Sequence, residues 1–173
     1  VAHTKRSSSL PQVTKRPSIS HVIWVKMCFL CRWDSRSWGS HPHAAACVHE
    51  LRASGLRVAL ATNPLFPAVA TQKRIRWAGL EPEDFDLYTT YESIGTCKPN
   101  PDYYRTVAAR MGVDPADCLM VGNDVSDDMP AASVGMKVFL LTDCLINAEN
   151  VDISAYANGS FDELMEYIAT LRA

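Results

Sequence analysis

The amino-acid sequence predicts an α/β fold in which helices cover both faces of a doubly wound parallel sheet. Short segments composed mainly of apolar residues occur at 56–61, 118–121 and 138–141, each preceded by a longer segment of helical character, and glycines separate the two kinds of segment. Continuous apolar runs are typical of strands that are buried on both faces, and parallel strands need helical crossovers between them. This alternation therefore indicates a parallel sheet between two helical layers.

The expected elements follow one another along the chain. We expect helices at residues 44–54, 66–78, 101–111, 126–134 and 161–171, and strands at 56–61, 85–90, 118–121 and 138–141. Glycines follow the first four helices, as is common at helix C-termini: Gly55, Gly79, Gly112 and Gly135. The last helix has Ser160 as its expected N-cap and Glu163 three residues later, which is the pattern of a capping box.

The charge distribution divides the 173-residue chain into two parts. Residues 1–49 contain seven basic residues and one acid, a net charge of +6, whereas residues 50–173 contain ten basic and eighteen acidic residues, a net charge of −8. We expect residues 1–43 to be an atypical basic leader, disordered or not native to the domain, and residues 44–173 to form the α/β core. Because the larger part is acidic, a uniformly basic nucleic-acid-binding protein is excluded.

Membrane insertion and disulfide bonds are not expected either. No stretch approaches the ~20 apolar residues that a membrane helix needs. No secretory signal precedes the six cysteines, so reduced thiols in a cytoplasmic protein are the better interpretation.

Polar residues follow the first two strands of the expected core. In doubly wound sheets, ligands bind outside the carboxyl ends of the strands. Thr62 and Asn63 follow the strand at 56–61 and provide a hydroxyl and an amide suited to a phosphate oxygen. Lys98 lies in the loop after the strand at 85–90, where Pro99 favours an extended backbone, and its ammonium could neutralise a phosphate. Taken singly, Thr62 and Asn63 are a weak signal, because Thr-Asn-Pro is also an ordinary turn, and a solvated surface lysine is the better explanation of Lys98.

A cluster of acids follows the strand at 118–121. Asn123, Asp124, Asp127 and Asp128 stand within six residues directly after this buried segment. Carboxylate oxygens suit Mg²⁺, which is commonly held by one or two carboxylates together with waters and substrate phosphate. The alternative is a helix N-terminus that carries acids because the helix dipole favours them.

Three stretches together resemble the second, third and fourth motifs of the haloacid dehalogenase (HAD) superfamily, and of phosphoglycolate-phosphatase-like members in particular. They are Ala61-Thr62-Asn63, Lys98-Pro99-Asn100-Pro101, and Val121-Gly122-Asn123-Asp124 continuing to Asp128. The resemblance covers roughly residues 44–173. It implies a Rossmann-like fold and Mg²⁺-dependent hydrolysis of a small phosphorylated metabolite through an aspartyl-phosphate.

The resemblance also implies a role for each matching residue. Thr62 and Asn63 would bind the phosphoryl group, and Lys98 would steady both phosphate and nucleophile. Asp124 and Asp128 would hold the metal. Because many relatives carry the first acid directly after the glycine, where this chain has Asn123, either Asn123 or Asp127 is an alternative ligand.

The chain departs from the family at the first motif. Members carry an Asp-x-Asp pair after the first strand, and its leading Asp is the nucleophile. Here the only acid before Glu50 is Asp34, which could follow a strand at 22–30, but only residues 35–43 separate it from the next helix. That is too short for the family's usual insert or cap. We therefore expect the first strand and the cap to be absent or replaced, and the phosphatase to be incomplete or inactive.

Two other functions stay open. One is a non-catalytic HAD-like remnant that binds Mg²⁺ or phosphate without turnover. The other is a zinc-binding interaction module built from Cys28, Cys31, His41 and His43. The cysteine pair has a common zinc spacing, whereas the two histidines are closer together than the usual gap of three to five residues.

Overall fold

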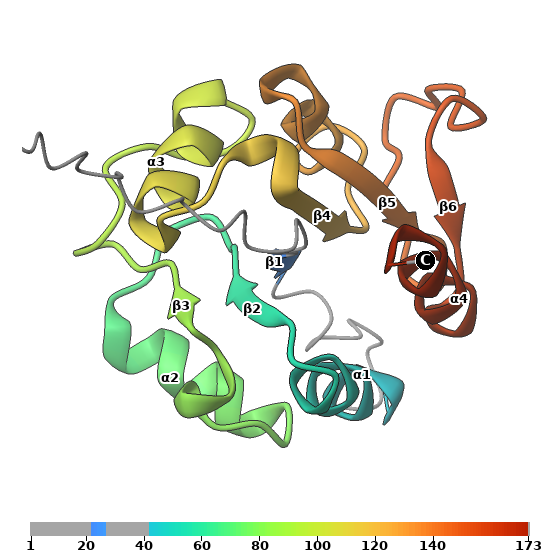
Figure 1. Ribbon diagram of the computed structural model, residues 1–173. Coiled ribbons are helices and arrows are strands. Elements are labelled where there is room, and N and C mark those ends of the chain that lie inside the picture. Colours follow the sequence, from blue (N-terminus) through green and yellow to red (C-terminus); the bar gives the residue numbers. More distant parts are fainter. Residues whose placement is uncertain (1–21, 27–41, 173) are drawn as a thin grey trace, which may run out of the picture.

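The computed structural model describes residues 22–26 and 42–172, and within them six strands form one parallel sheet. The strand order is β3-β2-β1-β4-β5-β6 (Figure 1). The bounds are β1 Val22–Val25, β2 Arg57–Leu60, β3 Leu87–Tyr88, β4 Cys118–Gly122, β5 Lys137–Leu141 and β6 Ala157–Gly159. The chain order reverses between β1 and β4, so the crevice at their carboxyl ends is the place where such sheets bind ligands.

Strand β1 takes the central position of the sheet. Val22–Val25 pairs with β2 on one side and with β4 on the other, and all four of its residues are buried. A segment of the part that we expected to be a basic leader outside the core, Val22–Val25, thus supplies the central strand of the sheet. Residues 1–21 and 27–41 of the expected leader lie outside the described residues.

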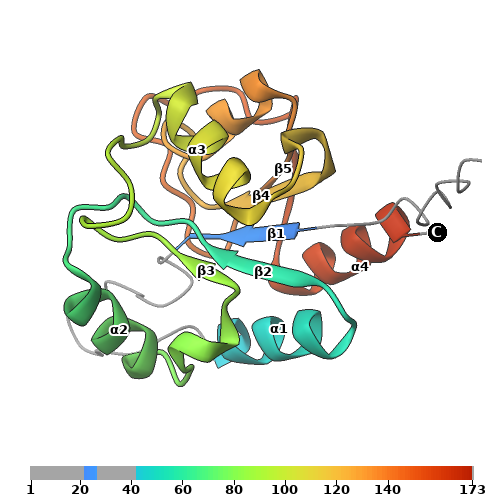
Figure 2. The ribbon, with the colours of Figure 1, turned by 60° about the vertical axis from the view of Figure 1, so that its left-hand side comes forward.

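Helices cover both faces of the sheet (Figure 2). On one face lie α1 (Pro42–Ala53), α2 (Ala68–Trp77) and α4 (Phe161–Arg172), and on the other lie α3 (Pro101–Met111) and the 3₁₀ helix η4 (Met129–Val134). Along β1 the side chains alternate between these layers. Ile23 and Val25 belong to the core beneath α1 and α4, while Val22 and Trp24 belong to the core beneath α3. The predicted α/β class, with both faces of a parallel sheet covered, is confirmed.

Most predicted elements are confirmed with small changes of boundary. The helix expected at 66–78 begins only at Ala68, after Pro67, and the strand expected at 85–90 shortens to β3. The capping box of α4 forms, because the Ser160 N–H donates to the Glu163 carboxylate over 2.7 Å. The short strand β6 was not predicted, since its sequence, Ala-Asn-Gly, has no apolar run.

The predicted helix at 126–134 is wrong in its first turn. The regular part, η4, begins at Met129 and is a 3₁₀ helix. The Asp124 carboxylate accepts the N–H groups of Ser126 and Asp127 and thereby holds the preceding residues in a turn. Asp side chains compete with helical hydrogen bonds in this way. The acids consequently gather in a loop and not along one face of a helix.

Two observations on the described residues concern membrane-spanning helices and cysteines. Over residues 22–26 and 42–172, no helix combines the length and the apolar character needed to cross a bilayer. Cys47, Cys97 and Cys118 are free thiols.

Candidate active site

Four loops converge where the central strands end. The residue after β1 is Lys26, the residues after β2 include Thr62 and Asn63, the loop before α3 contributes Lys98, and the loop after β4 contributes the acids. The structure thus brings together, at the carboxyl ends of the strands, the residues that their places after strands predict to lie there: Thr62, Asn63, Lys98, Asp124, Asp127 and Asp128. Lys26 is the member of this group that the sequence reasoning missed.

Thr62 and Asn63 are held by the loops around them. The Thr62 N–H donates to the Thr89 hydroxyl over 2.9 Å, and the Thr62 carbonyl accepts the hydroxyls of Thr89 and Tyr103. The Asn63 side chain joins two loops, because its Oδ1 accepts the Lys98 N–H over 2.8 Å and its Nδ2 donates to Asp127 over 3.0 Å. Asn63 therefore fixes the lysine loop and the acid loop relative to each other.

Lys98 forms a buried ion pair with Asp128. Its Nζ lies 2.6 Å from Asp128 Oδ1, and both side chains are completely buried. The second oxygen, Asp128 Oδ2, accepts the backbone N–H groups of Asn123 and Asp124, each over 3.1 Å. A buried carboxylate needs such partners, and this one is fixed by three donors.

The backbone turns past Asp128 so closely that residue 122 has room only for glycine. A Cβ on Gly122 would lie 2.2 Å from Asp128 Oδ2. This glycine is therefore required by a close approach of the carboxylate to the end of β4.

The acid loop directs its polar groups to two sides. The Asn123 Nδ2 donates to the Cys144 carbonyl over 2.5 Å, toward the loop after β5. Asp124 has its Oδ2 beside Lys26. Asp127 is half-buried, and this burial raises the pKa of its carboxyl group, whereas the Lys26 ammonium acts to lower that pKa. Of the two alternatives, Asn123 and Asp124, it is therefore Asp124 whose side chain lies with Asp127 and Asp128 around Lys26.

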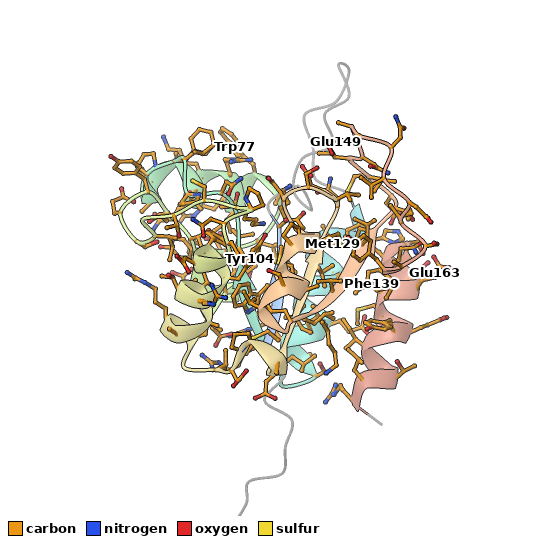
Figure 3. All side chains as sticks on the ribbon, turned by 90° about the horizontal axis from the view of Figure 1, so that it is seen from above. Trp77, Tyr104, Met129, Phe139, Glu149 and Glu163 are labelled. Carbon is orange, nitrogen blue, oxygen red and sulfur yellow. The ribbon has the colours of Figure 1, made fainter. Side chains whose placement is uncertain are left out.

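Aromatic side chains from α3 support the site from below. The Tyr104 hydroxyl donates to the Asp127 carbonyl, and the Tyr103 ring lies 5.7 Å from Lys98 Nζ (Tyr104 is labelled in Figure 3). Burial raises the pKa of both phenols well above the usual range, so they act as neutral hydrogen-bond donors.

Lys26 stands directly after the central strand, where the resemblance to the HAD superfamily leads one to expect an aspartate nucleophile. Its Nζ lies 3.3 Å from Asp124, 3.6 Å from Asp127 and 3.4 Å from Asp128. The sequence contains a feature that could have revealed this role. Residues 22–31 are apolar except for Lys26. A lysine in such a run is expected where the strand meets a polar site.

The sequence contains one Asp-x-Asp triplet, Asp84-Phe85-Asp86, but it lies at the amino ends of the strands, on the side of the sheet away from this site. Asp86 precedes β3, and its carboxylate accepts the Val58 N–H near the start of β2 and a bond from Arg52 over 2.6 Å. It stabilises the amino ends of the strands and is not a nucleophile motif.

The arrangement does not fit the Mg²⁺ ion that the family resemblance implies. Mg²⁺ requires oxygen ligands at about 2.0–2.1 Å in octahedral geometry. Here the three carboxylates are directed at an ammonium group, and in the described part of the chain no group of three or more His, Cys, Asp or Glu side chains has the arrangement of a metal site. Asp124, Asp128 and Asp127 are therefore not assigned as metal ligands in this chain.

Some of the residues that the sequence analysis proposed for the site fall outside the described residues. Asp34, the candidate nucleophile, is one of them. Cys28, Cys31 and His41 of the zinc hypothesis are others, and their partner His43 is exposed on α1, 3.9 Å from Asp162.

Comparison with known proteins identifies the family. Residues 19–135 match the family model described as haloacid dehalogenase-like hydrolase. The chain is 28% identical over 134 residues to the glyceraldehyde 3-phosphate phosphatase of Methanocaldococcus jannaschii, covering 76% of this chain and 58% of that protein. It is 32% identical over 117 residues to the phosphoglycolate phosphatase of Escherichia coli K12, covering 65% of this chain and 44% of that protein.

Solved structures agree with this result. A HAD phosphatase from Thermococcus onnurineus matches with a TM-score of 0.60 and 25% identity, covering 75% of this chain and 58% of that one. A predicted phosphoglycolate phosphatase from Haemophilus somnus 129PT shares the fold, with a TM-score of 0.62, 23% identity, and coverage of 74% of this chain and 56% of that one. The chain spans about half the length of the curated relatives it matches. Because the family model covers more than half of its residues, the chain belongs to the haloacid dehalogenase-like hydrolases.

Proposed function

We propose that this chain is a phosphatase-derived domain that binds a small phosphorylated metabolite and does not hydrolyse it. The names of its relatives, a glyceraldehyde 3-phosphate phosphatase and a phosphoglycolate phosphatase, support the substrate class. Thr62, Asn63 and Lys98 gather at the carboxyl ends of the strands, which supports a phosphate site there.

One observation carries the loss of turnover: Lys26, and not an aspartate, follows the central strand. Covalent phosphoryl transfer needs an oxygen nucleophile in line with phosphorus, and a protonated amine has no lone pair with which to attack. The Lys26 Nζ lies within 3.6 Å of three carboxylates and is engaged as their counter-ion. This site supports binding better than group transfer.

The remaining parts of the proposal concern setting and cofactor. We place the protein in the cytoplasm, because Cys47, Cys97 and Cys118 are free thiols, and we expect no nucleic-acid partner for an acidic core. Mg²⁺ is not part of the proposed function, because the carboxylates of the acid loop are directed at the Lys26 ammonium.

Two measurements on the purified full chain test the proposal. Hydrolysis of p-nitrophenyl phosphate with added Mg²⁺ should not exceed the buffer background. Binding of 2-phosphoglycolate, followed by calorimetry, should be detectable and should weaken in Thr62→Val, while the exposed variant Lys73→Met should bind as the unchanged chain does.

The two parts of the proposal fail separately. Turnover that disappears in Asp34→Asn would overturn the loss of catalysis and make Asp34 the nucleophile. Absence of binding for 2-phosphoglycolate, glyceraldehyde 3-phosphate and inorganic phosphate alike would reject the phosphate site.

A further inference from the structure

The position of Lys26 has a consequence for the acid cluster that does not depend on substrate binding. Asp124, Asp127 and Asp128 come from one short loop, and each has a carboxylate oxygen within 3.6 Å of the same Nζ. The Lys26 side chain is only 13% exposed, and Asp128 is completely buried. An ammonium on a neighbouring strand thus stands at the point toward which three carboxylates converge.

Two lysines, Lys26 and Lys98, balance the negative charges of the three carboxylates. Lys98 Nζ pairs with Oδ1 of Asp128, and Lys26 Nζ approaches Oδ2 of the same carboxylate. In the described residues, the ion pairs that Asp124 and Asp127 form are those with Lys26. Without Lys26, three carboxylates would face one another at short range, which is strongly unfavourable in a partly buried site.

The backbone fixes where the ammonium lies. The Lys26 N–H donates to the Val121 carbonyl at the end of β4. The carbonyl of Val25, the last residue of β1, accepts the Ala61 N–H, so the end of β1 is tied to both neighbouring strands. Because the cation is covalently attached to the central strand, its local concentration at the acids is high and constant. A divalent ion would have to displace it and leave a poorly solvated ammonium beside a second positive charge.

We propose that Lys26 is an internal cation that takes the place of a divalent metal in this site. The folded chain therefore does not need Mg²⁺ for stability, and removal of the ammonium converts the acid cluster into a site that divalent ions stabilise. This inference is independent of the proposed phosphate binding, because it concerns the charges of the protein alone.

Thermal unfolding of the full chain tests it, with MgCl₂ as the probe. The unchanged chain should have the same Tm in EDTA and in MgCl₂. Lys26→Met should have a lower Tm in EDTA, and its Tm should rise with MgCl₂ concentration, because a ligand that binds only the folded state stabilises it by mass action. Lys73→Met, which removes an exposed lysine of α2, should show neither effect.

A second variant covers the case in which Lys26→Met does not fold in EDTA. Lys26→Arg keeps the cation and should remain independent of Mg²⁺. A Lys26→Met chain that folds on addition of MgCl₂ supports the inference, whereas one that stays unfolded overturns it. A rise of Tm with MgCl₂ in the unchanged chain, equal to that in Lys26→Met, would also overturn it, whatever the outcome of the phosphate-binding experiment.

Discussion

The buried ion pair between Lys98 and Asp128 allows a quantitative test of the structure. The change Lys98→Met keeps most of the side-chain volume and removes the ammonium. Asp128 would then remain completely buried, with its two backbone donors and Lys26 at 3.4 Å as its remaining partners. The expected result is a large loss of stability without a change of fold.

The size of the loss follows from the geometry. At the observed 2.6 Å, the Coulomb attraction is about 6 kcal/mol for an effective dielectric constant of roughly 20. Desolvation of both groups offsets much of that gain, and removal of one partner of a buried pair typically costs about 3–5 kcal/mol. Because Lys26 still faces the carboxylate, we expect a loss near the lower end, about 3 kcal/mol.

Urea unfolding followed by circular dichroism measures this loss. With a slope of about 2 kcal/mol per molar urea, the midpoint should fall by about 1.5 M. In a double-mutant cycle, Asp128→Asn should cost clearly less in the Lys98→Met background than in the unchanged chain. A loss below about 1 kcal/mol for Lys98→Met, or additive effects in the cycle, would refute the buried pair.

Two further predictions concern packing and ionisation. Gly122→Ala should lose about 1–3 kcal/mol of unfolding free energy because its Cβ has no room, whereas Gly95→Ala, with no atom within 4 Å, should lose far less; equal losses would contradict the close approach. Burial raises the pKa of the Cys47 and Cys118 thiols from 9.0 to about 12. The stability that these thiols contribute is therefore complete below about pH 9 and is lost as the pH rises from there toward about 12. Urea unfolding between about pH 8 and pH 10 should show this decline, and Cys47→Ala/Cys118→Ala should flatten it; an unchanged slope would point to other groups.

The sequence predicted the scaffold of the site better than its electrostatics. Residues 118–121 are recognisable as a buried strand because every one is apolar, and the polar residues that follow such strands lie together for topological reasons alone. The hydrogen bonds of the Asp124 side chain, which replace the first turn of a helix, depend on a loop conformation that periodicity does not show. The role of Lys26 was missed because its partners lie about one hundred residues further along the chain.

The placement of Lys26, and not Asp34, after the central strand follows from what β1 has to bury. For Asp34 to stand where Lys26 stands, residues 30–33 would have to occupy the positions of β1, and Arg32 would replace Trp24. Trp24 is completely buried in the apolar core with Tyr103 and Met120. A guanidinium in that position would lose its hydration among apolar side chains, which costs several kcal/mol at least. A shift of β1 by one residue relative to its neighbours is also unfavourable, since it would exchange the side chains that face the two helical layers. The core therefore selects the register in which a cation, and not a nucleophile, reaches the acids.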